Sequence, residues 1–234
     1  MAKAYNPLDK ENLGTSVREA LLKAPILAMT DLVVKSKLRY SNKFDGAGIY
    51  AIYYVGSFLA YTSIASQNIG GKFESPIYVG KAVPEGSRKG GLLDKETPTS
   101  ALFERLKLHA QGIQEVSNLE LSHFHCRSLI VDDIWIPLGE TYMIHTFQPL
   151  WNKVVPGFGI KTPGKRRKDQ YASLWDTIHP GRKFVRRLGL PPNPKSEEKI
   201  LREIEDYLAM PQLEKAKVPV KDDGGPEDES VTAP

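Results

Sequence analysis

The 234-residue sequence contains little cysteine, no long apolar run and little net charge. Its single cysteine, Cys126, has no partner for a disulfide within the chain and lacks the neighbouring ligands of a zinc site, so we expect it to be a small buried side chain. No stretch of about 18 apolar residues occurs, and no signal-like apolar segment follows the first methionine. These absences argue against a membrane-spanning or exported protein and predict a cytoplasmic one.

The net charge of +4 conceals an uneven distribution. Residues 153–187 contain ten basic side chains and two acidic ones, whereas the last thirteen residues contain five acidic side chains and no basic one. A dense basic block is typical of a surface that binds a polyanion, because each cation replaces counterions on phosphate. A merely solvated face is the alternative. The candidate DNA contacts are Lys165, Arg166, Arg167, Lys168, Arg182, Lys183, Arg186 and Arg187.

The pattern of apolar residues indicates an α+β protein. β-branched and aromatic residues bounded by Gly or Pro predict strands, and apolar positions three and four apart predict helices. Strands come first in the chain, and helices then alternate with one more strand, which is the order of a small α+β sheet. The expected strands are 48–55, 76–82 and 123–131, and the expected helices are 16–22, 99–113, 134–147, 171–178 and 195–210.

Polar residues interrupt these apolar patterns at a few places. Arg105 and His109 stand four apart on one helix and therefore share a face, where they either converge on a ligand or form a solvated pair. Glu140 lies within an otherwise apolar helix, where a carboxylate requires a basic partner or a metal ion. Asn152 follows Trp151 at the start of a loop, where its amide either caps a turn or orients a ligand.

Two strands each place a tyrosine beside a glycine, as Gly48-Ile49-Tyr50 and Tyr78-Val79-Gly80-Lys81. Followed by Arg105-x-x-x-His109, a helical Glu140 and then Asn152, this order resembles the five-part signature of the GIY-YIG nuclease superfamily; only Val79 departs from the pattern, in place of Ile. Further blocks extend the likeness to type II restriction endonucleases of this superfamily that cut the palindrome CCGCGG. They are Tyr78 to Pro84, Pro149 to Asn152, Gly157 to Gly159 and Trp175 to Arg182.

The resemblance implies an α+β core with a small, mostly antiparallel central sheet flanked by helices, and the apolar patterns outside this core predict helical extensions at both ends. Pattern, charge and composition together divide the chain into four segments. These are an N-terminal helical extension at 1–40, a nuclease core at 41–153, a basic DNA-binding extension packed on the core at 154–211, and a disordered acidic tail at 212–234. We also expect the two strand glycines to let backbone and phosphate approach closely.

The residue types suit phosphodiester hydrolysis, which requires an activated water, stabilised phosphoryl oxygens and help for the leaving oxygen. Tyr50 is the candidate base, although a free phenol with a pKa near 10 is mostly protonated at neutral pH. His109 could receive its proton, Lys81 is a rival base, and Tyr78 could hold the phosphate or the water. Arg105 suits the phosphoryl oxygens.

Glu140 would bind one Mg²⁺, for which Mn²⁺ should substitute. The resemblance implies a supporting role for Asn152, either behind the groups that contact the substrate or on the phosphate side. The resemblance further implies double-stranded DNA as substrate, products with 5′-phosphate and 3′-hydroxyl ends, and a methyltransferase in the same system. A palindromic site also pairs naturally with a C₂ homodimer. The alternatives are a repair or mobile-element nuclease of the same superfamily, or a DNA-binding protein without catalytic activity.

Overall fold

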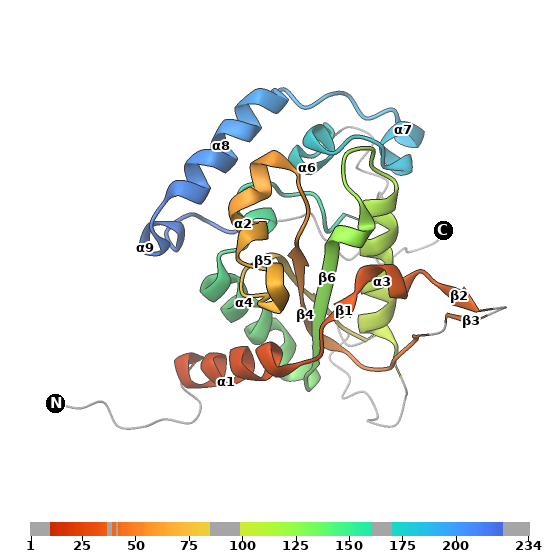
Figure 1. Cartoon of the computed structure of the whole chain (residues 1–234), viewed down its shortest axis with the longest axis vertical. Coiled ribbons are helices and arrows are strands. Elements are labelled where there is room, and N and C mark those ends of the chain that lie inside the picture. Colours follow the sequence, from red (N-terminus) through yellow and green to blue (C-terminus); the bar gives the residue numbers. More distant parts are fainter. Residues whose placement is uncertain (1–9, 37–38, 41, 85–98, 161–169, 222–234) are drawn as a thin grey trace, which may run out of the picture.

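The computed structural model describes residues 10–36, 39–40, 42–84, 99–160 and 170–221. Its centre is a four-stranded sheet of order β1-β6-β4-β5 in which every neighbouring pair is antiparallel. Two further short strands form a separate ribbon that projects from the body (Figure 1). The strands are β1 (Leu27–Ala28), β2 (Lys35–Ser36), β3 (Arg39–Tyr40), β4 (Gly48–Tyr54), β5 (Pro76–Ala82) and β6 (Phe124–Ile130).

Helices surround this sheet, so the predicted α+β class is confirmed. Short 3₁₀ turns connect several of them. The α-helices in the described part of the chain are α1 (Lys10–Lys23), α2 (Thr62–Ser66), α3 (Ala101–Gln114), α4 (Ile136–Phe147), α5 (Leu150–Lys153), α6 (Leu174–Ile178), α7 (Lys183–Leu188), α8 (Glu197–Ala209) and α9 (Gln212–Lys215). Among the described helices, none is long and apolar enough to cross a membrane.

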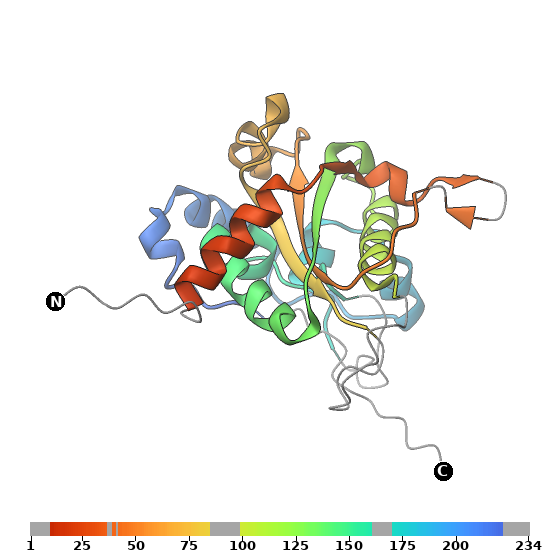
Figure 2. The same cartoon turned by 90° about the horizontal axis from the view of Figure 1, so that it is seen from below.

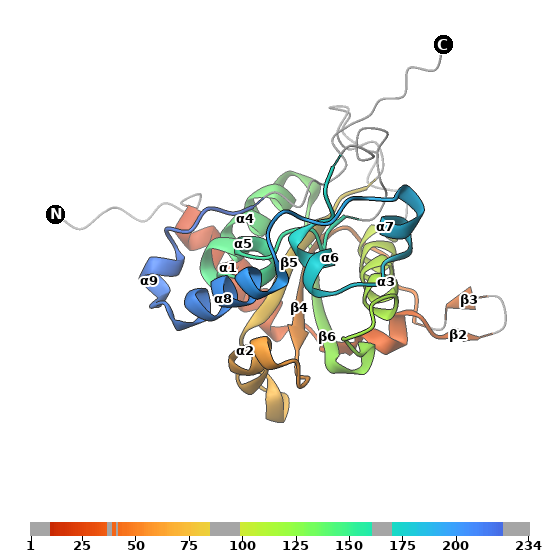
Figure 3. The ribbon, with the colours of Figure 1, turned by 90° about the horizontal axis from the view of Figure 1, so that it is seen from above.

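The central strand β4 is buried on both faces, and its side chains alternate between two cores. Ile49, Ala51 and Tyr53 point to one face, where α1 and α4 cover them. Tyr50 and Ile52 point to the other, where α3, α5, α6 and α8 lie. The two groups of helices lie on opposite sides of the sheet in Figures 2 and 3. Because Tyr50 is on the second face, the helix that carries Arg105 and His109 covers it.

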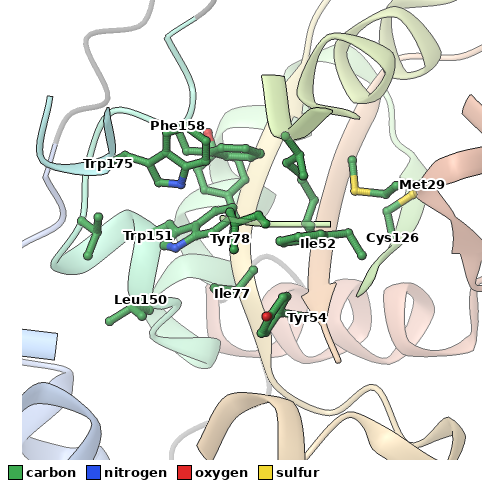
Figure 4. Packing of buried hydrophobic residues seen from close by; sticks show 14 of the residues in the cluster. Met29, Ile52, Tyr54, Ile77, Tyr78, Cys126, Leu150, Trp151, Phe158 and Trp175 are labelled. Atoms are coloured by element: carbon green, nitrogen blue, oxygen red, sulfur yellow. The ribbon is translucent and has the colours of Figure 1, made fainter. Parts of the chain in front are cut away.

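The N-terminal segment predicted as a helical extension contains α1 but also contributes to the sheet. Leu27 and Ala28 form β1, which pairs with Cys126 and His125 of β6 and makes one edge of the sheet. Cys126 is fully buried on β6, as expected, and burial raises the pKa of its thiol to about 12. Figure 4 shows Cys126 beside Met29 on the same side of the sheet as Ile52.

The prediction of a disordered tail from residue 212 is wrong for its first part. Helix α9 begins at Gln212, and the segment after it packs against α5. There the Lys221 main-chain N–H donates to the Asn152 carbonyl at 2.9 Å, and Lys153 Nζ donates to the carbonyl of Val218. Apolar contacts of Val218 and these hydrogen bonds explain why the segment after α9 is ordered. The acidic residues from 222 onward lie outside the described part of the chain.

Candidate active site

Tyr50 lies in the middle of the site, on the central strand β4. Its side chain is fully buried, and its hydroxyl lies 2.7 Å from Nε2 of His109. This is the length of a short hydrogen bond between a hydroxyl and a ring nitrogen. The pair can therefore pass a proton between phenol and imidazole. It brings together the candidate base and its predicted proton acceptor.

Aromatic rings surround this pair. Tyr78 on β5 lies 6.3 Å from Tyr50 and 5.3 Å from His109, measured between ring centroids. The ring of Phe158 stacks on His109 at 4.5 Å with an interplanar angle of 19° and meets Tyr78 edge to face. In Figure 4, Phe158 lies with Trp175 and Trp151 next to Tyr78. The sequence motif Gly157 to Gly159 pointed to this turn, but the role of Phe158 was missed.

The two motif glycines have steric roles that differ from the predicted approach of phosphate. A Cβ on Gly80 would lie 2.4 Å from the Tyr50 hydroxyl oxygen, so the bare backbone makes room for the phenol. Gly48 has φ +154°, and a Cβ there would lie 2.0 Å from the Leu129 carbonyl of β6. Only glycine tolerates both the torsion and the contact. Gly80 therefore leaves room for the Tyr50 phenol, and Gly48 allows β4 and β6 to approach each other closely.

Helix α3 places Arg105 and His109 on the face that covers the sheet. His109 is fully buried, so the alternative of a solvated pair is wrong. Arg105 is only partly buried, and its Nη2 donates to the Gly159 carbonyl at 3.1 Å. The i, i+4 spacing thus points both side chains toward the turn that carries Phe158. Arg105 is the group of this set that reaches the surface.

Lys81 and Glu140 form an ion pair, with Nζ 2.6 Å from Oε2. Their side chains are 38% and 19% exposed, so the pair is accessible to solvent and solutes. Lys81 faces the α4 side of the sheet, because residues of a strand alternate and its cross-strand neighbour Ile49 belongs to that core. Glu140 therefore has the basic partner that was one of its two predicted explanations.

The carboxylate of Glu140 also fits the other explanation. No cluster of three or more His, Cys, Asp or Glu side chains able to hold a metal occurs among the described residues. A single accessible carboxylate suits Mg²⁺, which keeps several waters and takes further oxygens from phosphate. The donor set therefore fits an ion whose binding depends on substrate, rather than one caged by the protein.

Asn152 has a structural contact that its sequence position did not reveal. Its Oδ1 accepts from the Val79 N–H and its Nδ2 donates to the Val79 carbonyl, both at 2.9 Å. β5 is the edge of the sheet, so this amide takes the place of a neighbouring strand. Asn152 fixes the strand between Tyr78 and Gly80, in agreement with a supporting role.

The basic candidates for DNA contact fall into three groups. Arg182 is only 2% exposed and pairs with the Asp176 carboxylate, so its prediction as a DNA contact is wrong. Lys183, Arg186 and Arg187 are exposed on α7. Lys165, Arg166, Arg167 and Lys168 lie outside the described residues.

Helix α7 lies at the far end of the helix that carries Arg105. Its first residue, Lys183, contacts Glu115 through its main-chain N–H at 3.0 Å and through Nζ at 3.4 Å. Glu115 follows Arg105 by ten residues, or about 15 Å along a helix. The exposed bases of α7 thus lie on a helix that begins next to the C-terminal end of α3.

A second buried phenol–imidazole pair lies elsewhere in the same core. The Tyr61 hydroxyl is 2.7 Å from Nε2 of His179, and it accepts a hydrogen bond from Trp151 Nε1 at 3.0 Å. Nδ1 of His179 lies 3.0 Å from Oδ1 of Asn118. Burial, and secondly the charge of Arg182, lowers the pKa of His179 to about 3. This histidine is held neutral within the protein interior.

The buried Tyr50–His109 pair and Arg105 at its rim lie together on the α3 side of the sheet, whereas Glu140 pairs with Lys81 on the α4 side. These are the residue types that phosphodiester hydrolysis requires, as in a GIY-YIG nuclease. The family model described as Eco29kI GIY-YIG domain matches residues 42–208, well over half of the chain. The chain therefore belongs to this GIY-YIG restriction endonuclease family, and it is a nuclease by that membership. A search of curated proteins found no match.

Proposed function

We propose that this protein is a type II restriction endonuclease that hydrolyses double-stranded DNA at a palindromic GC-rich site, with CCGCGG as the first candidate. The observation that carries the proposal is the 2.7 Å contact between Tyr50 and His109 in a chain of the GIY-YIG family. Membership supports nuclease activity, and the contact supplies a route for the proton that an attacking water must lose.

Tyr50 accepts the proton of the water in this proposal, and His109 takes the phenolic proton. Because Tyr50 is fully buried, DNA binding must open a path from the surface to its hydroxyl. Lys81 is the more accessible rival base, and its contact with Glu140 ties its role to that of the carboxylate. Tyr78, packed against His109, supports the pair and borders the path.

Arg105 stabilises the phosphoryl oxygens in the transition state, since its charge is permanent and its planar fork matches them. Its contact with the Gly159 carbonyl holds the guanidinium at the rim of the site. Glu140 would hold Mg²⁺, or Mn²⁺ in its place, and the ion would stabilise charge on the 3′ leaving oxygen. The products would carry 5′-phosphate and 3′-hydroxyl ends.

The exposed bases Lys183, Arg186 and Arg187 contact DNA in this proposal, together with the basic residues at 165–168. Most of these contacts are to phosphate, because phosphate contacts outnumber base contacts in protein–DNA complexes. A C₂ homodimer would read the two halves of the palindrome and cut one strand with each subunit. A cytoplasmic location and a protecting methyltransferase in the same system belong to the proposal.

The proposal is tested with purified protein, Mg²⁺ and a plasmid that contains one CCGCGG site. The expected product is linear DNA, formed by the wild type and abolished by EDTA or by Glu140→Ala. Glu203→Ala is the matched control, because Glu203 also pairs with a lysine, Lys195, at 2.7 Å, but on the surface of α8. It should cut normally.

Other outcomes of the same experiment have distinct meanings. A ladder of products, or cutting of a plasmid without the site, would refute the proposed specificity and favour a repair or mobile-element nuclease. Binding to DNA without cutting would favour the protein without catalytic activity. Normal cutting by Glu140→Ala would remove the metal role from Glu140.

A further inference from the structure

Arg182 is a buried arginine whose five N–H donors all have acceptors within the protein. Nε and Nη2 donate to the two carboxylate oxygens of Asp176, each at 2.6 Å. Nη2 also donates to the Gly157 carbonyl at 2.7 Å, and Nη1 donates to the carbonyls of Phe158 at 3.3 Å and Ile160 at 2.9 Å. A guanidinium has five N–H donors in a fixed plane, so this geometry leaves it no capacity for DNA.

The turn at 157–160 therefore lies between two arginines. Three of its four carbonyls accept from Arg182, and the remaining one, of Gly159, accepts from Arg105 on the opposite side. The same turn carries Phe158, whose ring stacks on His109. A change in the path of this turn would move both the Arg105 guanidinium and the His109 ring.

The turn at 157–160 also packs closely against α6. Gly157 has φ +116°, and a Cβ there would lie 2.1 Å from Oγ of Ser173. That hydroxyl caps α6 by accepting from the Asp176 N–H at 3.0 Å, and it donates to Oδ2 of Asp176 at 2.6 Å. Trp175 N–H donates to the Pro156 carbonyl at 3.2 Å. Asp176 and Arg182 thus join α6 to Gly157, Phe158 and Ile160, the residues on either side of Gly159 and the one whose ring contacts His109.

We propose that the Asp176–Arg182 pair is a positioning device for DNA cleavage. It fixes the turn at 157–160 so that Phe158 holds the His109 ring against Tyr50 and Gly159 holds Arg105 at the scissile phosphate. The proposal rests on the function proposed above for Arg105 and His109. Its physical basis is that displacement of catalytic groups by about 1 Å can cost roughly 100-fold in rate.

Arg182→Lys tests the device, because lysine keeps the charge but lacks the planar fork that binds a carboxylate and three carbonyls together. The single-turnover cleavage rate of the folded variant should fall roughly 10- to 100-fold. Its affinity for the same duplex, measured without a metal ion, should stay at the wild-type value. An unchanged cleavage rate, or a loss confined to affinity, would overturn the proposal.

Tyr207→Phe is the matched structural control. It removes a buried hydrogen bond of 2.9 Å from Tyr207 to the Gln148 carbonyl. Tyr207 belongs neither to the turn at 157–160 nor to the Asp176–Arg182 pair. Its folded fraction should cleave at the wild-type rate. If both variants lose cleavage in proportion to their loss of folded protein, the Asp176–Arg182 pair has only a stabilising role and the proposal fails.

Two further measurements keep the proposal testable if Arg182→Lys folds poorly or the wild type does not cut. Phe158→Leu removes the ring but leaves every main-chain acceptor of Arg182, and it should also slow cleavage at unchanged affinity; cleavage at the wild-type rate would contradict the positioning role.

The NMR measurement uses the free protein. The ring-proton signals of His109, assigned by their absence in His109→Gln, should shift in Arg182→Lys and not in Tyr207→Phe. Unshifted signals would refute the positioning of His109 by the Asp176–Arg182 pair. A shift in a protein that has no nuclease activity would support this positioning but refute the proposed function.

Discussion

The protein contains two buried phenol–imidazole pairs with the same 2.7 Å contact, Tyr50–His109 and Tyr61–His179. They differ in their neighbours. Trp151 and Asn118 complete the hydrogen bonds of the second pair with neutral groups. The first pair lies below Arg105, a permanent cation at the rim of the site, and under the stacked ring of Phe158. The comparison teaches that a buried tyrosine–histidine contact occurs twice in this core, and that the two pairs differ in whether a partly exposed cation stands on the same helix as the histidine.

The largest difference is expected between the cleavage rates of the two histidine variants. His109→Gln should lower the single-turnover cleavage rate by roughly 100- to 10,000-fold, the usual contribution of a general acid or base. His179→Gln should cut at the wild-type rate per folded molecule. Both rates are measured on one CCGCGG duplex with Mg²⁺, and the folded fractions come from circular dichroism. Comparable losses in the two variants would mean that the pairs are not functionally distinct.

The two tyrosine variants should differ in stability, and here the larger loss is expected in the pair without a catalytic role, at Tyr61. Tyr61→Phe removes the hydroxyl that both His179 and Trp151 contact, and each buried polar atom left unpaired costs about 1–3 kcal/mol. Tyr50→Phe removes a hydroxyl for which one such contact, with His109, is described. Urea denaturation should therefore show the larger fall in the free energy of unfolding for Tyr61→Phe. A larger fall for Tyr50→Phe would contradict this assignment.

The pH dependence of stability gives a smaller effect. The pKa of His179 is lowered from 6.5 to about 3, so between these values only the unfolded state takes up the proton. The free energy of unfolding should fall as the pH decreases through this range, with about 2 kcal/mol lost from this group by pH 5. Above pH 6.5 this contribution is fully present. Denaturation at pH 7.5 and pH 5 measures it, and His179→Gln should show a correspondingly smaller difference; an equal difference would be inconsistent with a buried neutral histidine.

Much of the fold could be predicted because its main elements have strong local patterns. Strand β5 was predicted at its observed bounds, since Pro76 starts a run of β-branched and aromatic residues. Strand β1 was missed because Leu27 and Ala28 are too few for a period to appear, and only their pairing with β6 makes them a strand. The ordered segment after α9 was missed for a similar reason, since Val218 and Lys221 owe their order to tertiary contacts.

The site was predictable where its residues repeat a motif or a helical spacing, as Tyr50, Arg105 and His109 do. Arg182 was misassigned because a run of basic residues does not reveal which side chain is buried. Its role depends on the direction of the carbonyls at 157–160, which no local pattern specifies. Phe158 was missed because an aromatic residue in a Gly-rich turn is as typical of a core as of a site.

The most direct test of the account compares Tyr50→Phe with Tyr61→Phe in single-turnover cleavage of the same CCGCGG duplex, at saturating enzyme and with Mg²⁺. Each variant loses one phenolic oxygen from a buried pair of the same length. The account predicts that Tyr50→Phe loses at least roughly 100-fold in rate, while Tyr61→Phe, corrected for its folded fraction, cleaves like the wild type. Wild-type cleavage by Tyr50→Phe, or equal losses in the two variants, would contradict it.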